Sequence, residues 1–98
     1  MDKEKTLSAF EAVMPAFGIF QDKKRQQLMT ELCCKGELTV NELTATTSLS
    51  RPAVSHHLKL MLDAGVIKVE QVGVERRYSP NLEPVIKKLK DLTAALEE

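Results

Sequence analysis

Cysteine, tryptophan and long apolar runs are scarce in this sequence, and each absence excludes a class of protein. The two cysteines, Cys33 and Cys34, are neighbours, and a disulfide between adjacent residues is strained, so no disulfide framework is expected. No apolar run approaches the ~20 residues that span a bilayer, and the acidic start MDKEK lacks the basic region and apolar core of a signal peptide. We therefore expect no membrane partner and a cytoplasmic location.

Net charge is also missing, because 14 basic side chains balance 14 acidic ones. A neutral chain has no overall attraction to nucleic acid or to a charged surface, so such a partner must be recognised through local charge. The segment from Leu49 to Met61 supplies local charge, since it holds two basic side chains and no acidic one. The 98 residues suit a single domain, residues 1–98, whose small core would gain from a second subunit.

Two helices are predicted before residue 37. The first covers residues 4–14, where apolar side chains recur with helical spacing at Leu7, Phe10, Val13 and Met14. Pro15 would clash with the carbonyl of Glu11 in a straight helix, which predicts a kink or a break there. Asp22 can cap a second helix that stops near Gly36 and carries the apolar stripe Leu28, Met29, Leu32 and Cys33.

Two more helices flank a short turn. Thr39 and Glu42 form a T-x-x-E capping box that opens a short third helix. The segment TTSLS (46–50) is typical of a turn. Ser50 can then cap a fourth helix, which has Pro52 in its first turn and should end at Gly65.

A hairpin and a last helix follow. The β-prone runs VIKVEQ (66–71) and VERRYS (74–79) flank a turn near Gly73. Beyond Pro80, apolar residues with helical spacing predict a last helix through Leu82, Val85, Leu89, Leu92 and Leu96. The predicted fold is therefore mainly α with a β-hairpin wing. Its element order is that of a winged helix-turn-helix, whose second helix enters the major groove of DNA.

A helical wheel separates the two histidines of the fourth helix. His56 shares a polar arc with Arg51, Ser55 and Lys59, all of which can donate to phosphates or base edges, whereas His57 lies on the apolar side. We expect His56 to face DNA, with a merely solvated face as the alternative. We expect His57 to pack inside, with one ring nitrogen satisfied by the backbone. Adjacent histidines diverge by ~100° on a helix, which is unsuited to holding one metal ion.

Catalytic patterns are missing as well. Ser55 lies beside His56, but no glycine-flanked nucleophile elbow surrounds it and the chain has no glycine-rich phosphate loop. We therefore expect neither an enzyme nor a cofactor.

Three stretches resemble the ArsR/SmtB family of bacterial repressors: GELTVNEL (36–43), LSRPAVSHHLKLMLDAGVI (49–67) and the wing ending in RRYSPN (76–81). The resemblance implies a homodimer that represses transcription by binding operator DNA and often releases it when an inducer binds. Metal-sensing relatives commonly carry a C-x-C pair where this chain has Thr39 and Asn41, or acidic and histidine ligands on the last helix. Here that helix has Asp91 but no histidine or cysteine, so no metal site is expected.

One set of residues is predicted to contact DNA, and another is predicted to contact the second subunit of a homodimer. The candidate contacts to double-stranded DNA are Ser50, Arg51, Ser55, His56, Lys59, Lys68, Arg76 and Arg77. Because side chains alternate along a strand, only one of the two wing arginines should reach phosphate. The candidate homodimer contacts are Leu7, Phe10, Val13, Phe17, Leu82, Val85, Leu89, Leu92 and Leu96, with packing inside one subunit as the alternative.

The inducer and one alternative function stay open. Cys33 and Cys34 can form a vicinal dithiol that senses a thiophilic ion or an oxidant, but the apolar stripe favours a buried, structural Cys33. A winged-helix module that docks on another protein is the alternative to DNA binding. The basic, serine-rich fourth helix, which lacks aromatic anchors, favours DNA.

Overall fold

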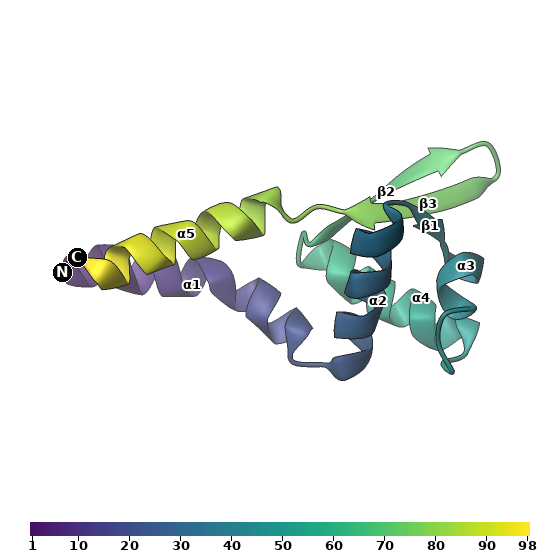
Figure 1. Ribbon diagram of the computed structural model, residues 1–98, viewed down its shortest axis with the longest axis horizontal. Coiled ribbons are helices and arrows are strands. Elements are labelled where there is room, and N and C mark those ends of the chain that lie inside the picture. The colour runs from purple at the N-terminus through teal and green to yellow at the C-terminus, as the bar shows by residue number, and fades with distance from the viewer.

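The computed structural model describes residues 1–98 as five helices and three strands (Figure 1). This confirms the predicted mainly α fold with a hairpin wing. In chain order the elements are α1 (Lys3–Phe20), α2 (Lys23–Lys35), β1 (Leu38–Thr39), α3 (Val40–Thr44), α4 (Arg51–Asp63), β2 (Ile67–Val72), β3 (Glu75–Pro80) and α5 (Glu83–Glu97).

Local capping starts α2, α3 and α4, as predicted. With the sheet, these three helices form the central unit of the fold. The carboxylate of Asp22 accepts from the backbone N–H of Arg25 at the start of α2, and the hydroxyl of Ser50 accepts from that of Ala53 at the start of α4. At α3 the capping box is complete, with Thr39 and Glu42 each bonding the other's backbone N–H. Each cap satisfies N–H groups that a helix leaves unpaired at its first turn.

The wing is a three-stranded antiparallel sheet in the order β1-β3-β2. The hairpin of β2 and β3 turns at Gly73, whose φ of 63° suits glycine, as the sequence predicts. Strand β1 is not predicted from the sequence, and it pairs Leu38 with Tyr78 and Thr39 with Arg77. A two-residue strand has no periodicity of its own, so only its pairing with β3 defines it.

A single apolar core lies between α2, α3, α4 and the sheet. Leu32, Leu43, Val54, Leu58 and Met61 are fully buried in it. Residues of α2, α3 and the sheet therefore enclose the apolar side of α4, which leaves its polar side outward. The core fixes the direction of α4 relative to the wing.

Helices α1 and α5 pack along each other and form an arm that extends away from this unit, with both termini at its far end (Figure 1). The molecule is accordingly elongated, 49 × 26 × 21 Å. Of the kink or break predicted at Pro15, the break is wrong, because α1 continues through Pro15 to Phe20. Pro15 and Glu11 are both exposed, so water can reach the Glu11 carbonyl that loses its helical donor.

The nine predicted dimer residues occupy three different environments in the arm. Val13, Val85 and Leu92 are buried within the single chain, and Leu82 and Leu89 are half-buried against its core. For these five residues, packing inside one subunit accounts for the apolar side chain. Leu7, Phe10, Phe17 and Leu96 are exposed, and Met14 and Ile86, which the predicted set omits, are exposed with them.

No helix in the structure is both long enough and apolar enough to cross a membrane.

Candidate nucleic-acid interface

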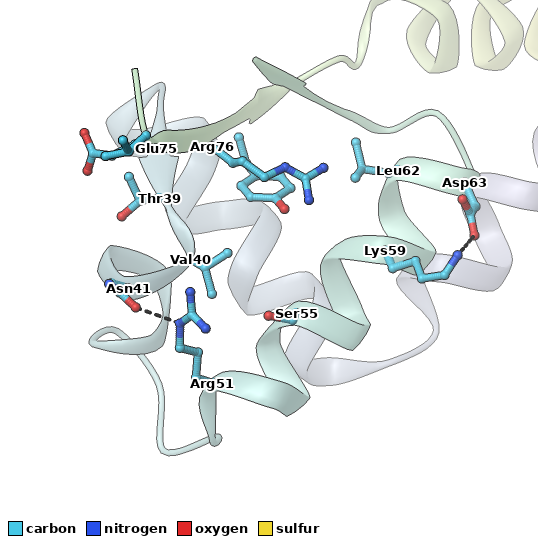
Figure 2. Close-up of a pocket in the computed structure, with 12 residues that line it drawn as sticks. Thr39, Val40, Asn41, Arg51, Ser55, Lys59, Leu62, Asp63, Glu75 and Arg76 are labelled. Atoms are coloured by element: carbon cyan, nitrogen blue, oxygen red, sulfur yellow. Dashed lines mark hydrogen bonds and ion pairs between the residues drawn. The ribbon is translucent and has the colours of Figure 1, made fainter. Parts of the chain in front are cut away.

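A groove separates the polar side of α4 from the wing (Figure 2). Its volume is about 690 Å³. The lining residues come from four elements and one turn: Thr39, Val40, Asn41, Arg51, Ser55, Lys59, Leu62, Asp63, Val74, Glu75, Arg76 and Tyr78. Four of the eight predicted DNA contacts, Arg51, Ser55, Lys59 and Arg76, are thereby brought to one surface, which we call the α4–wing groove.

Arg51 is the first residue of α4, and its side chain reaches back to α3. Its Nε donates to the Oδ1 of Asn41 at 2.8 Å, as Figure 2 shows. No carboxylate lies within 4.0 Å of the Arg51 guanidinium. Its positive charge is therefore uncompensated.

Lys59 lies one turn beyond Ser55 on the same side of α4. Its ammonium pairs with the carboxylate of Asp63 at 3.7 Å, in an exposed i,i+4 contact. Such exposed pairs are weak, so water or a phosphate can replace the carboxylate. In the structure, the carboxylate of Asp63 nevertheless partly compensates the positive charge of Lys59.

The two wing arginines lie on opposite faces of β3, as alternation predicts. Arg76 shares a face with Tyr78, and its guanidinium carbon lies 5.8 Å from the centre of the tyrosine ring, without an acidic partner. Arg77 faces away from the groove and pairs with Glu75 at 3.2 Å and Glu37 at 3.5 Å. The hydrogen bond that Arg77 donates to Glu75, reinforced by the charges of both carboxylates, raises the pKa of Arg77.

Charge in the groove is therefore unevenly compensated. Asp63 and Glu75 are the two acids of the lining, and both are paired with other cations, Lys59 and Arg77. Arg51 and Arg76 remain as the unpaired charges, and each is held by a neutral group, an amide or an aromatic ring. Guanidinium groups presented in this way suit phosphate oxygens and base edges.

A segment that contains this helical unit matches a known family. Residues 22–69, from the cap of α2 into β2, match the model described as bacterial regulatory protein, arsR family. The chain is also 33% identical over 86 residues to the uncharacterized HTH-type transcriptional regulator YuzN of Bacillus subtilis (strain 168), covering 82% of this chain and 90% of that relative. The chain belongs to the ArsR family.

Two further comparisons agree with this assignment. The regulator is 38% identical over 69 residues to the arsenical resistance operon repressor of Bacillus subtilis (strain 168), covering 70% of this chain and 66% of that repressor. Its fold is similar to the ArsR-like transcriptional regulator from Rhodococcus sp. RHA1, with a TM-score of 0.79 and 22% identity over 93% of this chain and 83% of that one. The chain is a winged helix-turn-helix regulator of transcription and not an enzyme.

The structure places the remaining predicted DNA contacts outside the α4–wing groove. Ser50 is exposed and acts as the cap of α4. Lys68 is exposed on the face of the sheet that also carries Arg77. His56 is exposed on α4 but does not line the groove, so a contact with DNA would have to form beside it.

His57 has a different partner from the one predicted. It is half-buried, and its Nδ1 lies 3.4 Å from Nη1 of Arg25. A guanidinium only donates, so Nδ1 is the acceptor in this contact. The expected backbone partner is wrong, because a side chain from α2, 32 positions away, occupies that place.

The two cysteines of the regulator are both exposed. The expectation that Cys33 packs in the core is wrong. Residues 33–37 are all exposed, so the last turn of α2 lies at the surface. The core contacts this helix only as far as Leu32.

The residues at the two familiar metal positions have other partners here. Thr39 caps α3, Asn41 accepts from Arg51, and Asp91 on α5 pairs with Lys87 at 3.1 Å. No group of three or more histidine, cysteine or acidic side chains gathers anywhere in the structure.

Sequence reasoning missed Asn41 and Tyr78, the neutral residues that contact the two unpaired arginines. An i,i+4 count can find the pair of Lys59 and Asp63, and alternation can place Arg76 on the face of Tyr78. Neither rule places Asn41 against Arg51, because that contact depends on the angle between α3 and α4.

Proposed function

We propose that this regulator is a repressor that binds an inverted-repeat operator as a homodimer, with α4 of each subunit in the major groove. The observation that supports this most is the pair of uncompensated arginines, Arg51 and Arg76, on either side of the α4–wing groove. A regulator that acts on bacterial promoter DNA works in the cytoplasm.

The homodimer is supported by the exposed side of α1. Leu7, Phe10, Met14 and Phe17 recur at helical spacing and lie on one side of the helix, with between 41% and 58% of each exposed. A continuous apolar stripe of this kind usually marks an interface. Two copies joined through the arm would present two α4 helices to two half-sites related by the same two-fold axis.

The wing arginines provide the first test. Random duplex DNA is bound to the full chain and the retained sequences are read; the best duplex then serves as the probe. Arg76→Ala should weaken binding to all duplexes by about tenfold and lower the slope of log affinity against log salt by about one unit, as the loss of one phosphate contact does. Arg77→Ala should change affinity less than about threefold, because Glu75 and Glu37 already compensate its charge.

Arg77 is a matched control, because it adjoins Arg76 and carries the same charge. A larger loss from Arg77→Ala than from Arg76→Ala would contradict the orientation proposed for the wing. If the wild-type chain retains no duplex and Arg76→Ala changes nothing, DNA binding through this groove is refuted, and a protein-docking module becomes the better account.

The exposed cysteines support a second proposal, that Cys33 and Cys34 receive the inducer. Adjacent, exposed thiols suit a soft ion such as trivalent arsenic, which prefers sulfur ligands. One similar protein is an arsenical resistance operon repressor. The proposed inducer is therefore a thiophilic ion and not zinc, for which the chain offers no gathered ligands.

Arsenite alone tests this proposal. It should lower the affinity of the wild-type chain for its selected duplex at least tenfold, while the C33S/C34S variant should bind equally well with and without it. Zinc should change neither chain. Release of the double variant by arsenite, or of either chain by stoichiometric zinc, would show that the inducer site lies elsewhere.

A further inference from the structure

We infer that Asn41 is a positioning residue for sequence recognition: it holds the Arg51 guanidinium so that its free edge meets two acceptors on a guanine base. This inference rests on the proposed binding of DNA through α4. Asn41 would then act through Arg51, which it contacts, and not through a contact of its own with DNA.

The contact joins the two helices of the helix-turn-helix. Asn41 is the second residue of α3 and Arg51 the first residue of α4, ten positions later. The Arg51 Nε donates to the Asn41 Oδ1 at 2.8 Å, and both side chains line the α4–wing groove (Figure 2). Asn41 therefore reaches Arg51 from across the turn.

The bond leaves the part of Arg51 that reads bases free. An arginine has five N–H donors in a planar fork, and Asn41 uses the one on Nε. The four donors on the two Nη atoms have no partner in the chain. A carboxylate at position 41 would compensate the positive charge, whereas the neutral amide orients the guanidinium and leaves its charge intact.

Orientation matters because Arg51 is exposed and its side chain has several rotatable bonds. Ordering such a side chain on binding costs free energy, and a contact that orders it beforehand reduces this cost. Residues at the start of a recognition helix are those that reach base edges, and the O6 and N7 atoms of guanine accept two donors from one arginine. The position of Arg51 at the start of α4 fits this contact.

A four-protein comparison tests the inference. Wild type, N41A, R51A and N41A/R51A are each bound to random duplex DNA, the retained sequences are read, and affinities are measured on the duplex that wild type prefers. R51A should lose the preference for guanine at one position of each half-site and bind about 5- to 150-fold more weakly. N41A should weaken the same preference and bind about threefold to tenfold more weakly. Adding N41A to R51A should have no further effect.

Two controls separate positioning from other effects. Gln27→Ala removes another exposed polar side chain, on α2, and should change neither affinity nor base preference. Replacing the selected guanine with 7-deazaguanine removes the N7 acceptor, and it should weaken wild type more than R51A. The melting temperature of N41A should equal that of wild type, since the contact it removes is exposed.

Three results would overturn the inference. One is an N41A variant that keeps the full guanine preference, and another is N41A weakening the R51A protein as much as it weakens wild type, which would mean that Asn41 contacts DNA by itself. The third is R51A weakening all duplexes equally, which would assign Arg51 to phosphate. Failure of the proposed function is distinct from all three, because the wild-type chain would then retain no preferred sequence.

Discussion

Arg25 lies where three helices meet, and its side chain is only 16% exposed. Its Nε donates to the carbonyl of Ile19 at 2.8 Å, near the end of α1, and its Nη1 donates to His57 on α4. It also lies 3.9 Å from the carboxylate of Asp22. The backbone N–H of Arg25 donates to that carboxylate and, more than the nearby charges do, lowers the pKa of Asp22. The Arg25 side chain thus connects the arm, through Ile19 of α1, to the recognition helix, through His57 of α4.

Removal of the His57 ring should therefore destabilise the fold. His57→Ala leaves one guanidinium N–H of a largely buried arginine without an acceptor, which costs about 1 kcal/mol and lowers the melting temperature by roughly 4–8 °C. His56→Ala is the matched control, because its ring is exposed on the same helix and should leave the melting temperature within about 1 °C of wild type. Equal melting temperatures for the two variants would contradict this role of His57.

Helix α3 depends on its capping box more than a longer helix would, because it has only five residues. Thr39→Ala should lower the free energy of unfolding by about 1 kcal/mol, as the loss of such a cap usually does. Thr39 is also the last residue of β1, so the change loosens the junction that places Asn41 beside Arg51. Urea unfolding measures the stability, and Thr30→Ala on the exposed side of α2 is a matched control for a threonine that caps no helix.

Glu42 makes this element sensitive to acid. The backbone N–H of Thr39 donates to its carboxylate, and this bond, with help from the Thr39 hydroxyl, holds the pKa of Glu42 below its usual 4.5. A lowered pKa in the folded state stabilises the fold above pH 4.5, and the contribution is lost as the pH falls through the lowered value. Glu42→Gln should therefore lose less stability than wild type between neutral pH and about pH 3. If the stability of the two proteins fell equally with pH, Glu42 would not be a source of the acid sensitivity.

At the scale of the whole molecule, the arm exposes the apolar stripe of α1, which the proposed homodimer would bury. Phe10→Lys/Phe17→Lys should convert the proposed dimer, twice 11.0 kDa, into a monomer of about 11 kDa in sedimentation at micromolar concentration. The same variant should bind the selected duplex at least tenfold more weakly, because the two half-sites are then bound independently. Its melting temperature should also fall, because a monomer lacks the stability that association adds to a dimer. That added stability depends on protein concentration.

A matched variant separates loss of the interface from added charge. Gln27→Lys/Thr30→Lys also adds two lysines at exposed positions, but on α2 and not on the apolar stripe of α1, and it should keep the mass and affinity of wild type. A wild-type chain that sediments as a monomer, or a Phe10→Lys/Phe17→Lys variant that keeps the wild-type mass, would contradict a dimer through this arm.

Sequence alone determined those features that neighbouring residues decide. A cap and its N–H partner are three positions apart, a hairpin needs one glycine with positive φ, and the polar side of α4 follows from its 3.6-residue period. These contacts form within a turn or two of the chain, so Asp22, Thr39, Ser50 and Gly73 could each be assigned without knowing the tertiary structure.

Tertiary structure decided which of the predicted residues are free to act. Arg51 is held by the neutral amide of Asn41 and Arg77 is paired with Glu37, because the packing of separate elements places Asn41 and Glu37 beside these arginines. The exposure of Cys33 depends likewise on how far the core extends along α2. Residues 10 to 40 positions apart make these contacts, and their proximity depends on helix angles and strand pairing that no local pattern encodes.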